Sequence, residues 1–270
     1  MLKQAMELLY LQYNQCAEAV KDNAHYCYYA EEKIKHSLQV AGAGNYLLRH
    51  IEWFKNKPAE YIEMVQTAIL LHDVCRFSEI AALYQGVKRY DHGVAAYEFL
   101  RYAPLFNDIR IRLPIKHHGH LIRDLYADAE YQSLSEDMRD EVEKICFAVR
   151  DADKIANFNM LINEPYFRPL FVDMEKEITD ADLQISEHIL QSAYKGDTVP
   201  KPFITLGDHV TSLLSWLEDI NYQAALDYCD KLNLTEQIFA MFDKYCGNFE
   251  FKQKYAAFVR DYLQNHQFLR

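Results

Sequence analysis

The stretch from Ala68 to Phe77, A-I-L-L-H-D-V-C-R-F, places a histidine and an aspartate side by side within an apolar run. An ionised carboxylate in such a run is costly unless a cation or dense hydrogen bonding compensates its charge. A divalent metal ion would compensate Asp73, and imidazole and carboxylate together suit the borderline and harder divalent ions. The structural alternative is that Asp73 ends a helix and pairs with Arg76, while His72 is only packed. If the stretch forms a metal site, Asp73 depends on the bound ion for compensation of its negative charge.

The scarcity of turn formers limits the fold class. The chain has 270 residues but only 8 glycines and 7 prolines, and half of its residues are hydrophobic. Frequent Leu, Ala, Glu and Lys favour helices with short connections, and no window shows the sustained two-residue alternation of a strand. We therefore predict an all-α protein, long enough for one large domain or for a domain with an appendage.

Charge and cysteine usage narrow the partners and the compartment. The net charge of −11 disfavours a nucleic-acid polymer, because phosphates would be repelled over most of the surface. A small phosphorylated ligand stays compatible, since a local metal ion can outweigh the global field. The six cysteines are scattered without a C-x-x-C pair, as expected for reduced thiols in the cytoplasm. The chain shows no signal-peptide pattern and no membrane-length apolar window, so we expect a cytoplasmic protein without a membrane partner.

Hydrophobic periodicity predicts the helices. His36 lies on the apolar stripe of the second helix, and His72 lies at the inward end of the stripe of the third. The small residues at 41–44 let another helix approach closely, and Asp91 is a suitable N-cap for the helix that opens at His92. The expected helices span about residues 2–20, 31–54, 59–74, 92–103, 108–116, 136–160, 171–194, 206–229 and 234–264, with a short helix and loop over 78–91 and connections at 22–30 and 124–136.

Five separated pieces carry histidines and aspartates in a fixed order. They are K-H-S at 35–37, H-D at 72–73, D-H-G at 91–93, H-H-G at 117–119 and R-D-A-D-K-I at 150–155. Read as H-S-L-x-V-A, L-L-H-D-V-x-R-F, D-H-G, I-x-H-H and R-D-A-D-K-I, they resemble the HD-domain superfamily of metal-dependent phosphohydrolases over roughly residues 30–160. The resemblance implies an HD-type metal-binding helical core over 1–164 and a C-terminal helical extension, 165–270, packed on it.

The resemblance also implies the ligands of a metal ion. The family's ligands fall on His36, His72, Asp73 and Asp153. Asp151 is the rival of Asp153, but residues two apart on a helix point about 200° apart, so only one of them can face a given ion. We interpret Asp151 as a solvated or arginine-paired carboxylate.

Further side chains match positions near the family's site. His92 and His118 are candidates for ligands of a second metal ion or for substrate contacts, whereas His117 and His120 are expected either at the surface or in contact with the ligands from outside. Candidate phosphate contacts lie inside the matched motifs at Arg76 and Lys154 and outside them at Lys88, Arg89, Lys116 and Arg123. Each of these cations has an alternative role as the partner of a nearby carboxylate.

The implied activity is hydrolysis of a phosphoester of a nucleotide or another small phosphorylated metabolite. One or two divalent ions (Mn, Fe, Co, Ni, Zn or Mg) would activate a water molecule, with Asp73, His92, His118, Arg76 and Lys154 as the catalytic residues. The chain departs from the family at Cys75, where glycine is usual, and at 155–157, where Ile-Ala-Asn follows in place of Leu-Asp. The G-Y-P signature of cyclic-dinucleotide phosphodiesterases is absent after His118.

Two other classes of function are compatible with the same residues. One is a non-catalytic metal-binding module with a regulatory or interaction role, for which the Tyr- and Phe-rich region 165–270 would supply a partner or homo-oligomer interface. The same region is alternatively just extra helices packed on the core. The other class is an iron-dependent HD-type oxygenase.

Overall fold

The computed structural model describes residues 1–163, 177–195, 198–199 and 202–270. Within these residues the regular elements are helices, and the one β-bridge, between Tyr222 and Leu269, is isolated. The predicted all-α fold is therefore confirmed. The chain forms two compact units, Met1–Ala156 and Asn157–Arg270, which are described separately. No helix in the described part of the chain is long and apolar enough to cross a membrane.

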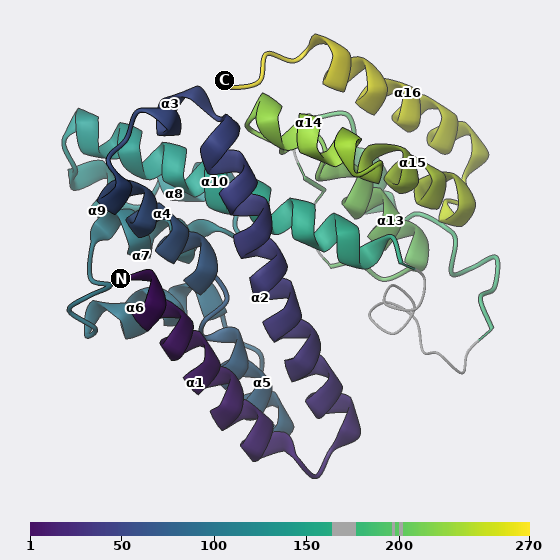
Figure 1. Cartoon of the computed structure of the whole chain (residues 1–270). Coiled ribbons are helices and arrows are strands. Elements are labelled where there is room, and N and C mark those ends of the chain that lie inside the picture. Colours follow the sequence, from purple (N-terminus) through teal and green to yellow (C-terminus); the bar gives the residue numbers. More distant parts are fainter. Residues whose placement is uncertain (164–176, 196–197, 200–201) are drawn as a thin grey trace. The chain divides into compact units, whose positions relative to one another are not determined.

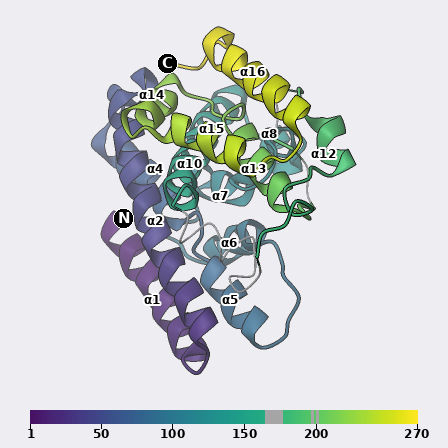
Figure 2. The same cartoon turned by 90° about the vertical axis from the view of Figure 1, so that its right-hand side faces the viewer.

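The first unit surrounds a buried central helix, α4. This helix packs against α1, α2 and α7, while α1 lies alongside α2 and α5, and α6 packs on α7 (Figures 1 and 2). The helices of this unit are α1 (Leu2–Val20), α2 (Ala24–His50), α3 (Glu52–Lys55), α4 (Ala59–Leu71), α5 (Arg76–Tyr84), α6 (His92–Arg101), α7 (Ile109–His117), α8 (Ile122–Tyr126), α9 (Ala129–Ser133) and α10 (Glu136–Leu161), whose last turns belong to the second unit.

A close approach of α2 and α4 fixes the middle of this unit. A Cβ atom built on Gly44 would lie 2.7 Å from two carbon atoms of the Ile69 side chain. Only a glycine at this position avoids that overlap, so the predicted role of the small residues in helix packing holds for Gly44. At Gly42, by contrast, a Cβ atom would meet nothing within 4 Å. The contact matters for the site because α2 carries His36 and α4 ends just before His72.

Three predicted elements of the first unit differ from the structure. The segment 22–30 was expected to be a connection, but α2 begins at Ala24 because the Asn23 side chain accepts hydrogen bonds from two backbone N–H groups of the first turn. The expected loop 124–136 contains most of α8 and all of α9, with Asp128 as the N-cap of α9. The expected helix 31–54 is divided at Ile51 into the end of α2 and the short helix α3.

The second unit is built around α15. Its described helices are α12 (Glu187–Ser192), α13 (Leu206–Ser215), α14 (Gln223–Lys231), α15 (Leu234–Tyr245) and α16 (Phe249–Asn265), and α15 contacts α13, α14 and α16. The expected helices 206–229 and 234–264 are each two helices. The predicted helix 171–194 lies partly outside the described residues, as does the predicted domain boundary at residue 164.

Aromatic side chains form much of the interior of the second unit. Tyr255 is fully buried and stacks on Phe251 and Phe258, and its ring also meets Phe242 edge to face. Its hydroxyl donates to the buried carboxylate of Glu218 at 2.5 Å. Part of the Tyr and Phe content of this region therefore serves internal packing.

Candidate metal centre

Six side chains that the sequence singled out come together inside the first unit. They form three overlapping groups, in each of which the nitrogen and carboxylate oxygen atoms lie within 4.8 Å of one another. The groups are His36, His72 and Asp73; His72, His118 and Asp153; and Asp73, His92 and His118. They are contributed by α2, the turn after α4, the start of α6, the end of α7 and α10.

The separations between these atoms suit coordination of a shared cation. Around a tetrahedral ion with ligands at about 2.1 Å, neighbouring ligand atoms lie about 3.4 Å apart. His36 Nε2 lies 2.9 Å from Asp153 Oδ1, and His72 Nε2 lies 3.6 Å from the same oxygen. His92 Nε2 lies 3.2 Å from His118 Nε2 and 2.9 Å from Asp73 Oδ1.

The backbone presents the Nε2 atoms of two histidines to the centre. His72 Nδ1 lies 2.9 Å from the carbonyl oxygen of Ile69, and His118 Nδ1 lies 2.7 Å from that of Ile115. A carbonyl can only accept, so each Nδ1 carries the proton and each Nε2 keeps its lone pair in the neutral ring. This is the usual orientation of a metal-binding histidine, whose second nitrogen donates to a backbone carbonyl or carboxylate.

His72 supplies the test of whether a cation fits. Its side chain is fully buried, and its Nε2 makes no hydrogen bond within the described part of the chain. Burial lowers the pKa of His72 to about 4, so the ring is neutral at physiological pH. A buried acceptor without a donor is unfavourable, and a divalent cation would satisfy it. The residues present therefore fit a divalent metal ion.

Asp73 is compensated by cations of the protein itself. Its carboxylate lies 3.4 Å from Lys33 Nζ and 3.6 Å from Arg76 Nε, and its side chain is 3% exposed. Burial alone would raise the pKa of Asp73, but Lys33 and Arg76 hold it well below the usual range. The predicted dependence of this charge on a metal ion is therefore not complete, because Lys33 and Arg76 also compensate it. Asp73 therefore pairs with Arg76 and also belongs to the His/Asp cluster.

His92 and His118 flank Asp73 in different electrostatic settings. Burial lowers the pKa of His92, although Asp73 acts in the opposite direction. Burial would also lower the pKa of His118, but the carboxylate of Asp73, 3.6 Å from His118 Nε2, raises it above the usual value. Arg76 Nη2 lies 2.9 Å from His92 Nε2, so Arg76 contacts both Asp73 and His92.

Two aspartates of α10 behave differently. Asp153 belongs to the second of the three groups within the described residues and Asp151 does not. Burial would raise the pKa of Asp153, but His36 and His72 lower it strongly. Asp151 is fully buried, which excludes a solvated carboxylate, and its pairing with an arginine stays a prediction. The helical geometry that separates the two side chains explains why only one of them joins the cluster.

The remaining cations have varied positions. Lys154 follows Asp153 on α10 and is buried, and its contact with a phosphate stays a prediction. Lys116 lies 2.5 Å from Asp128 Oδ2, which also lies 3.0 Å from His117 Nε2. Lys88 and Arg89 are exposed in the loop between α5 and α6.

Three residues near the cluster were not foreseen. Lys33 precedes His36 by three positions on α2, and Glu79 follows Arg76 by three positions on α5, so helical spacing places each pair on one face. Arg76 Nη1 donates to Glu79 Oε2 at 2.5 Å. Arg150 donates from Nη1 to the carbonyl oxygens of His117 and His118, which holds the end of α7 in place. The order of motifs alone contains no signal for this last contact.

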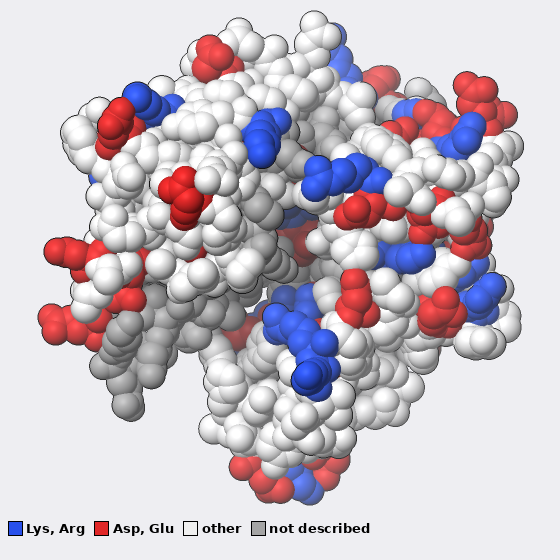
Figure 3. Space-filling model, turned by 180° about the vertical axis from the view of Figure 1, so that it is seen from behind, with Lys and Arg blue, Asp and Glu red and all other residues white. Residues whose placement is uncertain are grey.

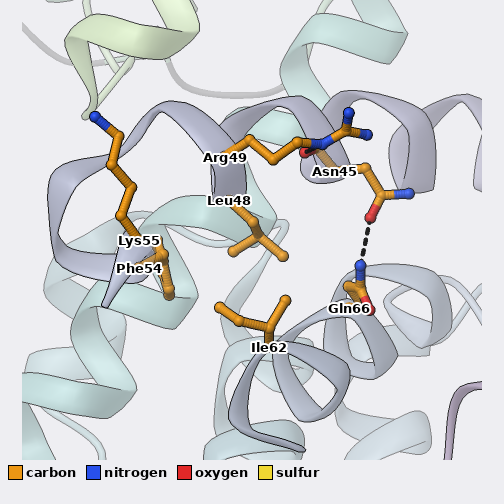
Figure 4. A pocket seen from close by; sticks show the side chains of 7 residues that line it. All are labelled: Asn45, Leu48, Arg49, Phe54, Lys55, Ile62 and Gln66. Carbon is orange, nitrogen blue, oxygen red and sulfur yellow. Dashed lines mark hydrogen bonds between the residues drawn. The ribbon is translucent and has the colours of Figure 1, made fainter. Parts of the chain in front are cut away.

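A separate pocket lies between α2, α3 and α4. Its volume is about 440 Å³. Figure 4 shows Leu48 and Ile62 in its interior and the hydrogen bond from Gln66 Nε2 to Asn45 Oδ1, which is 2.8 Å long. None of the six cluster residues lines it, so this pocket is distinct from the candidate metal centre.

The chain matches no known family model, no curated protein and no solved structure. Its class is therefore defined by the fold and the cluster. It is an all-α protein with a buried group of histidines and aspartates able to hold a divalent metal ion.

Proposed function

We propose that the protein is an HD-type metal-dependent phosphohydrolase acting on a nucleotide or another small phosphorylated metabolite. The observation that carries the proposal is the convergence of His36, His72, Asp73 and Asp153, together with His92 and His118, in three overlapping groups. This ligand set is the one that the resemblance implies, and a scaffold without chemistry has no need for it. A divalent ion bound there would lower the pKa of a water molecule and withdraw charge from a phosphoryl oxygen.

The protein's own residues would then orient the reactants. Phosphoryl transfer depends mainly on alignment and on stabilisation of charge. Asp73 would accept a hydrogen bond from the attacking water, and whichever of His92 and His118 does not hold an ion would take its proton. Arg76 touches Asp73 and His92 and donates to the phosphoryl oxygens.

The surface charge supports a small substrate. On the face seen in Figure 3, acidic and basic side chains are scattered among uncharged ones. A polymer backbone needs an extended basic track, whereas a single phosphorylated molecule needs only the charge at the centre.

The test is metal analysis of the purified protein combined with an activity screen. The protein should contain a divalent ion and hydrolyse at least one nucleotide or sugar phosphate after loading with Mn²⁺, Co²⁺, Ni²⁺, Zn²⁺ or Mg²⁺. His72→Ala should lose the ion and at least about a hundredfold in rate. His25→Ala, which changes an exposed histidine of α2, is the control and should retain both.

The other two classes of function predict different results. A non-catalytic module would bind the ion and leave every phosphoester intact. An iron-dependent oxygenase would be coloured and redox-active when loaded with iron. A protein that binds no divalent ion would contradict all three interpretations.

A further inference from the structure

The cations beside the candidate centre lie on its solvent side. The side chains of Lys33 and Arg76 are 15% and 16% exposed, and that of Arg89 is 64% exposed. The carboxylates with which they pair, Asp73 and Glu79, are only 3% and 1% exposed. An anion that approaches from solvent therefore meets the ammonium and guanidinium groups before it meets the carboxylates.

Glu79 holds two of these cations in place. Its Oε2 atom accepts from Arg76 Nη1 at 2.5 Å, and its Oε1 atom lies 3.3 Å from Arg89 Nε. Arg89 Nη2 also donates to the hydroxyl of Tyr29 at 3.4 Å. A guanidinium group has five N–H donors, so both arginines keep donors for a ligand. Because the Glu79 carboxylate is buried, the Arg76 guanidinium is oriented before a ligand binds, whereas the exposed Arg89 is held only by its ion pair and its hydrogen bond to Tyr29.

The charges of this network balance in the protein alone. Ion pairs join Lys33 and Arg76 to Asp73, and join Arg76 and Arg89 to Glu79. His72 lies between Asp73 and the third carboxylate of the network, Asp153. Within these ion pairs, three cations oppose three carboxylates when the histidines are neutral, as ligands must be. One divalent ion would therefore add two positive charges that these ion pairs do not compensate. A phosphate monoester carries about two negative charges at pH 7, whereas a diester carries one.

We infer that the substrate is a phosphate monoester, bound as its dianion by Lys33, Arg76 and Arg89 at the metal centre. The inference rests on the proposed phosphohydrolase function and names the class of phosphoester. In the reaction, the oxygen of water forms a bond to phosphorus and the ester P–O bond breaks. Its electron pair stays on the alcohol oxygen, which takes up a proton, so the products are an alcohol and inorganic phosphate.

Binding of inorganic phosphate tests the site without any turnover. In calorimetry with the Mn²⁺-loaded protein, phosphate should bind at one site per chain. Its Kd should rise about tenfold in Lys33→Gln and severalfold in Arg89→Gln, in keeping with the loss of a charge-assisted hydrogen bond. Lys35→Gln on the same helix and Arg101→Gln, whose exposed side chain also pairs with a glutamate, are the matched controls and should bind as wild type. Binding that is absent, or equal in all variants, would overturn the inference.

Hydrolysis of two model esters tests the substrate class. We expect a higher kcat/KM for p-nitrophenyl phosphate than for bis(p-nitrophenyl) phosphate, and Lys33→Gln should narrow that ratio mainly by raising KM for the monoester. A diester cleaved as well as the monoester, or a ratio unchanged in Lys33→Gln, would contradict the inference while leaving the phosphohydrolase proposal intact. If neither ester nor any screened metabolite is cleaved but the variants weaken phosphate binding, the anion site stands and the proposed function fails.

Discussion

Lys33 Nζ lies 3.4 Å from Asp73 Oδ2, which joins α2 to the turn after α4 through a pair of nearly buried charges. Because of this contact, neutralising Asp73 should affect the stability of the metal-free protein differently. In a site where the carboxylate depended only on a metal ion, neutralising it would relieve repulsion in the metal-free protein. Here Lys33 and Arg76 would instead lose their counter-charge.

Asp73→Asn should therefore weaken the protein in both metal states. In chelator, the free energy of unfolding should fall by about 1–3 kcal/mol, because the two cations keep their desolvation without their partner. With saturating metal, hydrolysis should fall at least about a hundredfold. Urea unfolding in the presence of chelator and a phosphatase assay measure the two effects. Wild-type stability in chelator would show that Lys33 and Arg76 do not need Asp73.

His92→Ala and His118→Ala should each reduce activity while one metal ion stays bound. The group of His36, His72 and Asp73 contains neither histidine, so these three ligands can keep an ion without them. Metal analysis after dialysis, together with steady-state kinetics, separates these outcomes. Unchanged kinetics in both variants would remove His92 and His118 from the site.

Gly44→Ala and Gly42→Ala should have opposite effects on stability. A Cβ atom at residue 44 would lie 2.7 Å from the side chain of Ile69, and such overpacking costs about 1–3 kcal/mol. At residue 42 there is no neighbour within 4 Å, so alanine should stabilise the helix by about 0.5–1 kcal/mol. Thermal unfolding of both variants measures the difference. Equal effects would mean that α2 and α4 do not approach as closely as the structure shows.

The stability of the first unit should depend on Asp128 at low pH. Burial raises the pKa of this carboxyl, but Lys116 and His117 outweigh it and lower the pKa to about 2. Because this value lies below the unfolded pKa of about 3.9, the stabilisation is present above pH 4 and is lost as the pH falls toward 2. The shift corresponds to about 2 kcal/mol.

Asp128→Asn isolates this contribution, because asparagine still serves as the N-cap of α9. The difference in unfolding free energy between wild type and variant, measured by urea titration, should shrink from about pH 6 to about pH 2.5. A difference that stays constant over this range would show that the Asp128 charge is not stabilised by its neighbours.

The sequence was most informative where spacing and chemistry agree. The apolar stripes placed His36 and His72 toward the interior, and the structure buries both. Helical geometry separated Asp151 from Asp153, and only Asp153 joins the cluster. These predictions succeeded because they depend on the local period of a helix, which the chain carries in its own pattern.

The contacts that organise the site depend on tertiary packing. Helical spacing places Lys33 on the same face as His36, and Glu79 on the same face as Arg76. The sequence alone does not show whether such a charged side chain is solvated or paired with another charge. The break at Ile51 was missed because α2 and α3 read as one apolar pattern across it. The start of α2 was missed because tyrosines near Asn23 suggested a connection, while the cap itself was a readable signal.

The ligands of the candidate centre are also widely separated along the chain. His36 and Asp153 lie 117 positions apart, yet their side chains are within hydrogen-bonding distance. An ion that both residues hold would act as a reversible cross-link, which removes more freedom from the unfolded chain as the closed loop grows longer. During synthesis, the first four helices would emerge with an incomplete set of donors, and the set would close only once α10 had been made. An ion held by Asp153 could therefore bind only after the first unit had been completed.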